Sequence, residues 1–343
     1  MECCFAPMEG ITGYIYRNAH HQVFGGITTY YTPFITPTQT RRLSAKELND
    51  ILPEHNQGMR IIPQILTNKA EDFLWAAENM RQLGYEEINL NLGCPSGTVV
   101  SKNRGAGFLI MTEELNAFLD KVCDGMEKLN LKFSVKTRIG KVDPAEWEEL
   151  LEIYNRYPLE RLIVHPRIRT DYYKNHPNLD EFERAVGESR NKLCYNGDIF
   201  SAKDYQRFHE RFPQVDEIML GRGLLANPAL AEEICSLGGA DQKTGVNRAG
   251  TTMTGAVINC LDKTRLRQYH DAILHGYEEV TSGDRNVLFK MKELWYYMGD
   301  AFADGEKLLK KVKKAQHMGD YEAAVSRLFA ECELADPPRF HSR

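Results

Sequence analysis

A cysteine stands at the point where a predicted strand gives way to a turn. Residues 88–92 alternate apolar and polar side chains, as a buried barrel strand with functional inward residues would. Gly93 then permits a turn and Pro95 stops the strand from continuing, so Cys94 emerges from a rigid support. A thiol with an ordinary pKa of about 8.5 can donate a proton near neutral pH. Cys94 is therefore a candidate catalytic acid, although a free cysteine is also commonly a small buried side chain.

A lysine occupies the middle of another predicted strand, residues 133–137. If Phe133 and Val135 face surrounding helices, Lys136 faces the interior on the other side of the strand. Burying an ammonium group without a partner is costly, so this residue type indicates function. Two functions remain open for Lys136: a Schiff-base nucleophile, or a cation that stabilises a developing anion.

Glycine-containing turns follow the last two predicted strands. One is 196–198 (Asn-Gly-Asp) and the other is 221–223 (Gly-Arg-Gly). Glycines let backbone N–H groups approach an anion closely, and Arg222 adds a charged donor. These turns predict a phosphate site if the fold is a barrel, and are otherwise ordinary tight turns. Gln64 and His165, also at strand ends, are equally consistent with loop anchors.

Eight short apolar runs alternate with segments of helical spacing over the first two-thirds of the chain. The predicted strands are Cys4–Met8, Ile27–Tyr31, Ile61–Ile65, Ile88–Leu92, Phe133–Thr137, Leu162–His165, Leu193–Asn196 and Glu217–Leu220. Predicted helix starts are a capping box at Asn68 and Glu71, Asp143–Pro144 with Glu146, and caps at Thr112 and Ser201. This order favours an α/β fold, a (β/α)₈ barrel, over an open doubly wound sheet.

The remainder of the chain has a different residue pattern. Residues 237–256 are polar and glycine-rich, which is typical of a linker or loop. From 257 to 343 the apolar spacing is helical in four runs, predicting a helical bundle after a barrel domain of residues 1–236. Residues 307–314 hold five lysines, and Lys307, Lys310, Lys311 and Lys314 share one helical face.

Composition places the chain among globular proteins. Its 343 residues are 42% hydrophobic and 27% charged, with a net charge of -5 that gives no overall attraction for nucleic acid. Eight scattered cysteines without a CxxC pair favour neither a metal site nor a disulfide framework. No signal peptide and no run near the roughly 20 apolar residues of a membrane span is evident. These features predict a cytoplasmic enzyme without a metal.

In their order and approximate spacing, seven motifs resemble those of the flavin-dependent tRNA-dihydrouridine synthases. They are 6–12 (Ala-Pro-Met-Glu-Gly-Ile-Thr), Gln64, 91–95 (Asn-Leu-Gly-Cys-Pro), 104–107 (Arg-Gly-Ala-Gly), 135–138 (Val-Lys-Thr-Arg), 196–198 and 221–222. The resemblance covers residues 1–235 and continues more loosely at 291–295 (Met-Lys-Glu-Leu-Trp). One departure is Pro166, where the family usually has glycine between histidine and arginine.

The resemblance implies an FMN cofactor across the barrel mouth, NADPH as reductant and tRNA as partner. Implied flavin-binding residues are Pro7, Met8, Glu9, Gln64, Lys136, His165, Asn196, Gly197, Asp198, Gly221 and Arg222. Hydride would pass from reduced FMN to C6 of a uridine that has left its stack, Cys94 would protonate C5, and Asn91 would contact the uracil.

Binding of tRNA to an acidic protein requires a local basic surface. Lys310, Lys311 and Lys314 in the tail are candidates, or simply a solvated helix face. An expected basic rim on the barrel adds Lys102, Arg104, Arg138 and Arg167, with Arg169 and Lys174 nearby.

Three other functions remain open. One is an FMN-dependent barrel oxidoreductase acting on a free small molecule of the dihydropyrimidine or dihydroorotate type. A second is an aldolase that uses Lys136, and a third is an RNA-binding or chaperone protein without catalysis.

Overall fold

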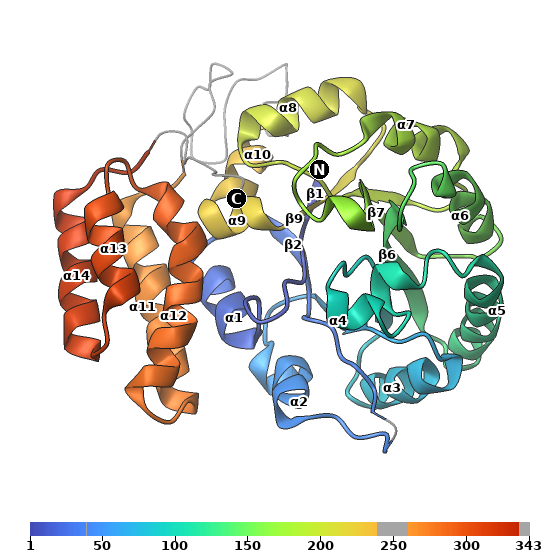
Figure 1. Cartoon of the computed structure of the whole chain (residues 1–343), viewed down its shortest axis with the longest axis horizontal. Coiled ribbons are helices and arrows are strands. Elements are labelled where there is room, and N and C mark those ends of the chain that lie inside the picture. The colour runs from blue at the N-terminus through green and yellow to red at the C-terminus, as the bar shows by residue number, and fades with distance from the viewer. Residues whose placement is uncertain (39, 239–259, 336–343) are drawn as a thin grey trace.

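The computed structural model describes residues 1–38, 40–238 and 260–335. A sheet of nine parallel strands forms a barrel at the centre of the first domain, and helices surround it (Figure 1). The strands are β1 (Glu2–Phe5), β2 (Ile27–Tyr31), β3 (Ile61–Ile62), β4 (Gln64–Ile65), β5 (Glu87–Leu92), β6 (Lys132–Gly140), β7 (Arg161–Ile168), β8 (Leu193–Tyr195) and β9 (Glu217–Leu220). The predicted barrel is confirmed.

Proline explains why nine strands appear where eight are predicted. The order in the sheet is β3-β2-β1-β9-β8-β7-β6-β5-β4, and its two end strands flank Pro63 in the chain. Pro63 has no N–H for a ladder bond, so the single predicted strand 61–65 divides there. Because β3 continues directly into β4, the sheet comes round on itself. The first predicted strand is also shorter than expected, since Ala6–Met8 lie in the loop after β1.

The barrel helices pack their apolar faces on the outside of the sheet. They are α1 (Tyr14–Val23), α2 (Ala45–Ile51), α3 (Ala70–Gln82), α4 (Gly97–Val100), α5 (Thr112–Lys128), α6 (Glu146–Tyr154), α7 (Leu179–Glu188), α8 (Ala202–Arg211), α9 (Arg222–Ala226) and α10 (Leu230–Gly238). Trp147 and Tyr154 of α6 are fully buried, as their spacing predicts. A smaller apolar cluster fills the barrel interior: Cys4, Ala6, Tyr31, Ile62, Ile163, Cys194 and Met219.

The predicted helix starts are partly wrong. Ser201 caps α8 by accepting a hydrogen bond from the N–H of Asp204, as predicted. Thr112 is the first residue of α5 and not its cap. The Asn68 side chain donates to the carbonyl of Lys102, so no capping box forms there and α3 begins at Ala70. Asp143 and Pro144 form a turn just before α6.

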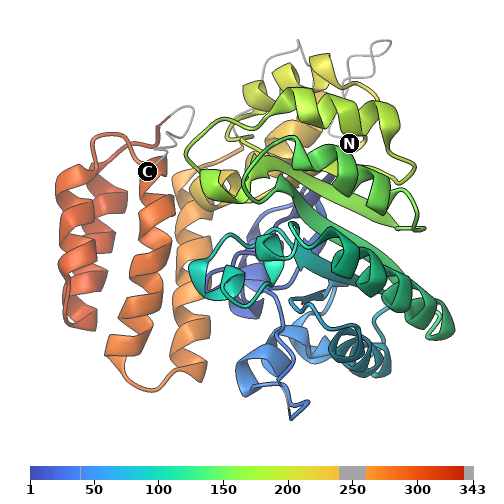
Figure 2. The same cartoon turned by 45° about the vertical axis from the view of Figure 1, so that its right-hand side comes forward.

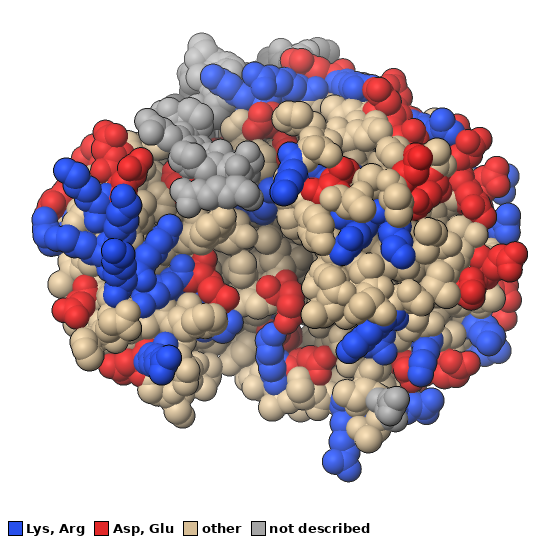
Figure 3. All heavy atoms as spheres, viewed as in Figure 1, with Lys and Arg blue, Asp and Glu red and all other residues tan. Residues whose placement is uncertain are grey.

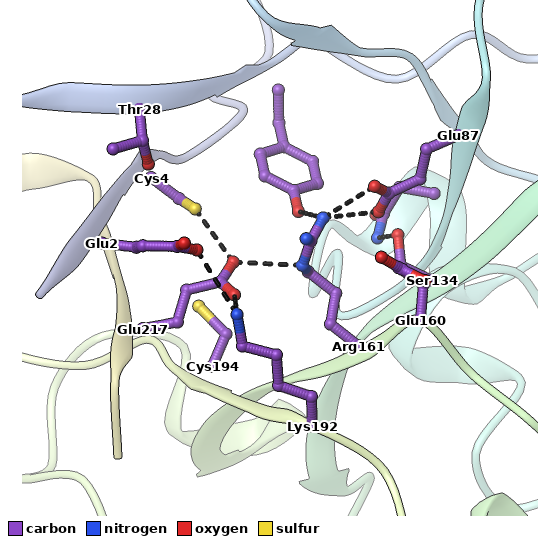
Figure 4. Close-up of polar contacts among 12 residues, drawn as sticks. Glu2, Cys4, Thr28, Glu87, Ser134, Glu160, Arg161, Lys192, Cys194 and Glu217 are labelled. Carbon is purple, nitrogen blue, oxygen red and sulfur yellow. Dashed lines mark hydrogen bonds and ion pairs between the residues drawn. The ribbon is translucent and has the colours of Figure 1, made fainter.

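Ionised side chains close the end of the barrel opposite the carboxyl ends of the strands (Figure 4). Arg161, at the start of β7, pairs with Glu87 at 2.6 Å and with Glu217 at 3.1 Å. Lys192 adds a 3.0 Å contact to Glu217. Buried Arg161 is therefore paired with two buried carboxylates, and exposed Lys192 adds a second cation to Glu217, so that none of the buried charges is left unpaired. These ion pairs serve stability, because the chemistry of a barrel belongs to the other face.

Four helices form the second domain beside the barrel (Figure 2). They are α11 (Lys263–Val280), α12 (Asp284–Met298), α13 (Glu306–Lys314) and α14 (Met318–Glu331). The predicted bundle is confirmed. Tyr269 of α11 packs edge-on against Tyr16 and Phe24, at 5.6 and 5.5 Å between ring centroids. Arg265 adds a bidentate ion pair with Glu232 of α10 at 2.8 Å.

Two further points concern the chain as a whole. The predicted linker at 237–256 falls almost entirely outside the described residues. Within the described ranges, no helix is long and apolar enough to cross a membrane.

Candidate active site at the barrel mouth

Strand β6 aims its polar side chains into the barrel. Val135 belongs to the outer core, and the Thr137 hydroxyl lies 2.9 Å from that of Tyr154 on α6. Because side chains alternate along a strand, Ser134, Lys136 and Arg138 point to the interior. The inward orientation predicted for Lys136 is confirmed. Burial, with a further effect of nearby Arg138, lowers the Lys136 pKa to about 8.

Three amide side chains connect neighbouring strands below the mouth. Gln64 donates from Nε2 to Asn89 Oδ1 at 2.7 Å, and Asn91 donates from Nδ2 to Gln64 Oε1 at 2.7 Å. Asn91 Oδ1 accepts from the N–H groups of Gly93 and Cys94, at 3.0 and 2.9 Å. Asn91 thus fixes the turn that carries the cysteine. Gln64 and Asn91 are both buried, and each keeps unused hydrogen-bonding capacity for a ligand.

The loop after β5 places Cys94 at the mouth, half-buried. Its carbonyl accepts a hydrogen bond from the N–H of Ala106 at 3.1 Å. Gly105 has φ +54°, and a Cβ there would come within 2.9 Å of the Cys94 carbonyl oxygen, so the loop requires this glycine. Burial raises the Cys94 pKa, while a backbone hydrogen bond at Ser96 and nearby Arg138 oppose the rise. The thiol is therefore kept in its protonated form.

Arginine side chains gather around Asp198 where β7 and β8 end. Arg167 donates to Asp198 Oδ1 at 2.9 Å, and Arg222 does so at 2.8 Å. His165 Nε2 lies 3.0 Å from Arg167 Nη1. Because arginine only donates, this nitrogen must accept, and the imidazole is neutral with its proton on Nδ1. Burial and then Arg138 lower the His165 pKa well below its usual value, which agrees with the neutral form.

Three of the predicted phosphate-binding residues have structural roles at these strand ends. Asp198 orients Arg167 and Arg222. Asn196 donates to the Met219 carbonyl at 2.8 Å. A Cβ on Gly197 would collide with the Tyr195 side chain, which explains glycine there.

The loop between β1 and α1 lies against the glycine turn after β9. A Cβ on Gly221 would meet the Ala6 Cβ at 3.4 Å and the Met8 sulfur at 3.8 Å, so Gly221 leaves room between the two loops. Pro7 and Met8 are partly exposed at the mouth. Glu9 points away to an exposed ion pair with Lys46 at 2.6 Å.

Two residues of this region have no signal in the sequence. Tyr173 lies between two arginines, with its ring centroid 4.6 Å from Arg222 Cζ and 5.3 Å from Arg138 Cζ. Lys290 of α12 donates to the carbonyl of Gly10 at 3.2 Å. A tyrosine in a polar loop and a lysine on a helix are common surface residues, so only the fold reveals these positions.

The expected basic rim is only partly exposed. Lys102 is exposed and Arg104 is half-buried. Arg138 and Arg167, by contrast, are each 1% exposed. Arg138 donates to the carbonyls of Gly93, Ile168 and Tyr172, and Arg167 to that of Asn175. The expectation that these two arginines lie on an exposed rim is wrong, because their donors turn inward to backbone carbonyls.

Lysine side chains cover one face of α13, on the left in Figure 3. Lys307, Lys310, Lys311 and Lys314 are all exposed there, while Leu308 and Val312 are buried on the opposite face. The predicted lysine face is confirmed as a surface feature of the helical domain.

Comparison with known proteins identifies the family. The family profile described as Dihydrouridine synthase (Dus) matches residues 4–326. The chain belongs to the dihydrouridine synthase family. It is 30% identical over 242 residues to the tRNA-dihydrouridine(16) synthase of Pseudomonas putida, covering 69% of this chain and 74% of that protein. It is 26% identical over 235 residues to the probable tRNA-dihydrouridine synthase 2 of Bacillus subtilis, covering 66% of this chain and 70% of that protein.

A solved structure shares the barrel fold. Morphinone reductase in complex with tetrahydroNAD superposes with a TM-score of 0.51 at 13% identity, covering 76% of this chain and 94% of that one.

The mouth of this dihydrouridine synthase barrel fits a flavin better than a metal. It combines Lys136 and Arg222, the neutral donor His165, and a glycine turn that leaves room beside Met8. Among the described residues, Cys4, Cys194 and Glu217 have ligand atoms within 4.8 Å of one another. That cluster lies at the opposite end of the barrel, and both oxygens of Glu217 are already paired with Arg161 and Lys192 (Figure 4).

Proposed function

We propose that this dihydrouridine synthase reduces the C5–C6 double bond of a uridine in tRNA, with FMN as cofactor and NADPH as electron donor. The observation that carries the proposal is a protonated, half-buried thiol at an electropositive barrel mouth. When bound, reduced FMN supplies the hydride, and the chain must supply the proton. Cys94 would donate that proton to C5, and the 2.9 Å hydrogen bond from its backbone N–H to Asn91 Oδ1, which fixes the turn that carries the thiol, supports this role.

Other side chains would bind and orient the cofactor. Arg222, together with the turns at 196–198 and 221–222, would hold the phosphate, and His165 Nδ1–H would donate to it or to the flavin. Gln64 and Lys136 would face the ring, Lys136 stabilising negative charge. Pro7 and Met8 would line it, while Glu9, which is paired with Lys46, would lie at the edge.

Recognition of tRNA would use the exposed cations. The lysine face of α13, with Lys310, Lys311 and Lys314, offers charge for phosphates, and Lys102 and Arg104 offer it at the mouth. Arg138 and Arg167 would act instead inside the site, by shaping its loops.

Two measurements on the purified protein test the proposal. A flavin visible spectrum, together with dihydrouridine formed in an unmodified tRNA transcript under NADPH, would support it. A flavin spectrum with NADPH oxidation that responds to free pyrimidines and not to tRNA would favour the small-molecule oxidoreductase.

The Lys136 pKa of about 8 is the one observation that favours the aldolase alternative, because a neutral amine is nucleophilic. If the protein is colourless and borohydride traps a covalent adduct between Lys136 and a carbonyl compound, the aldolase function would replace the proposal.

A further inference from the structure

Two large aromatic side chains are exposed on α12. Phe289 is 62% exposed and Tyr296 is 43% exposed. They are seven residues apart, so they lie on the same helical face with about 10 Å between them along the axis. Phe289 is the most exposed large hydrophobic side chain of the described residues.

Each of these rings lies next to a lysine ammonium. Lys290 Nζ is 5.9 Å from the Phe289 centroid, and Lys313 Nζ is 5.7 Å from that of Tyr296. Lys313 comes from α13, so the aromatic face of α12 is continuous with the lysine face shown in Figure 3. Glu293 also lies on α12 and takes up part of the Lys290 charge at 3.2 Å.

We propose that Phe289 and Tyr296 form a stacking surface for unpaired bases of the tRNA, with the neighbouring lysine face of α13 contacting the phosphates. The inference rests on the proposed function and specifies how the helical domain holds the RNA. Every nucleobase has a flat face that stacks on an aromatic ring, and ring-plus-cation surfaces bind unpaired strands without reading their sequence. A uridine that must leave its stack lies in an unpaired region, so unpaired bases are available near the site.

The lysine pairing selects nucleic acid over a protein partner as the occupant. An apolar protein contact would gain nothing from ammonium groups beside both rings. A nucleic acid uses both groups of each ring–lysine pair, because its bases stack on the ring and its phosphates attract the ammonium group.

Stacking and phosphate contacts differ in how they respond to salt. Losing a phosphate contact reduces the slope of log affinity against log salt, by about 0.7 to 0.9 for each contact. Losing a stacked base weakens binding without changing that slope, by roughly 5- to 100-fold for each ring removed.

The experiment measures tRNA affinity over a salt series for the flavin-loaded wild type, Phe289→Ala, Tyr296→Ala and the double variant. Phe289→Tyr and Tyr296→Phe keep the rings, and Val280→Ala removes another exposed apolar side chain, 58% exposed, from α11. We expect each alanine variant to lose about 5- to 100-fold in affinity with an unchanged salt slope. The ring-keeping variants and Val280→Ala should bind like the wild type, and all should retain flavin, NADPH oxidation and the wild-type Tm.

Unchanged affinity in the double variant would overturn the stacking proposal and leave a protein partner as the occupant of the surface. A reduced salt slope in the alanine variants would also overturn it, by assigning the loss to displaced lysines. These outcomes presuppose a wild type that binds tRNA and forms dihydrouridine; a wild type that does neither refutes the proposed function instead.

Discussion

Replacing Lys136 with methionine should stabilise the flavin-free protein while weakening flavin binding. The ammonium group is buried among other cations in the barrel, and its pKa falls from 10.5 to about 8. That lowering corresponds to a destabilisation on the order of 3 kcal/mol when the lysine is charged. Because part of the side chain stays accessible at the mouth, this figure is an upper bound. Methionine has a similar length and removes the charge.

The pH dependence of the effect follows from the direction of the pKa change. Below pH 8 both the folded and the unfolded chain carry the charge, so the wild type bears the full cost. Between pH 8 and 10.5 the folded protein loses the proton before the unfolded chain does, so the wild type gains stability as pH rises. The advantage of Lys136→Met should therefore be largest below pH 8 and decrease up to pH 10.5. The difference between the two proteins isolates Lys136 from other groups that titrate in this range.

Chemical denaturation of both flavin-free proteins across this pH range measures the difference. Lys132→Met, at the exposed start of the same strand and 3.1 Å from Glu160, is the matched control. We expect no stabilisation from the control. In the flavin-loaded Lys136→Met variant, reduction of the flavin by NADPH should be roughly 100- to 1000-fold slower than in the wild type. This is the usual cost of losing a group that stabilises transition-state charge. An advantage that does not change with pH, or unaltered flavin reduction, would refute this account of Lys136.

Three further predictions concern other parts of the molecule. Cys94→Ala should retain flavin and NADPH oxidation but form little dihydrouridine in tRNA, because the proton donor is lost; undiminished product measured by nucleoside mass spectrometry would contradict this role. Changing Lys310, Lys311 and Lys314 to Glu should weaken tRNA binding and reduce its salt slope with flavin content intact, whereas an unchanged slope would mean a merely solvated face. Lys290→Met should release flavin about 2- to 10-fold faster, because the 3.2 Å hydrogen bond from Lys290 to the Gly10 carbonyl holds the loop of Pro7 and Met8. Lys292→Met is the control, because Lys292 contacts the carbonyl of Ala315 within the helical domain and should not affect flavin release. Equal release rates from the two variants would argue against the positioning role of Lys290.

The succession of strand-like and helical segments predicted the barrel, and alternation within residues 133–137 predicted the inward face of β6 on the condition that Phe133 and Val135 face the helices. Val135 and Thr137 face the helices, so Lys136 has to face the interior whatever the rest of the fold does. The turn at Gly93–Pro95 likewise places Cys94 at the strand end by local chemistry alone. These features depend on neighbours in the chain, and sequence records such neighbours directly.

Features that depend on distant contacts were not predictable in this way. Arg138 sits at the end of a strand, where it could equally reach solvent or turn inward. Its orientation is decided by carbonyls of Gly93, Ile168 and Tyr172, which three different segments supply. The bond from Lys290 to Gly10 joins residues 280 positions apart. The break of the third predicted strand at Pro63 lies between these two cases. The proline is present in the sequence and affects the hydrogen-bond ladder locally, so the break could have been predicted.

Pro166 illustrates how a departure from the family pattern is accommodated. Strand β7 continues across it, and the register with β6 shifts: Arg138 pairs with His165, and Gly140 with Ile168. An advance of two residues along β6 therefore corresponds to three residues along β7, which is a β-bulge. Proline is tolerated at a bulge because one N–H there has no partner in the hydrogen-bond ladder. The Pro166 carbonyl accepts from the N–H of Asn178, at 2.6 Å. The rigid ring therefore lies in a part of the strand that needs no ladder donor. Arg167 beside it still reaches both His165 and Asp198, so the proline leaves these contacts intact.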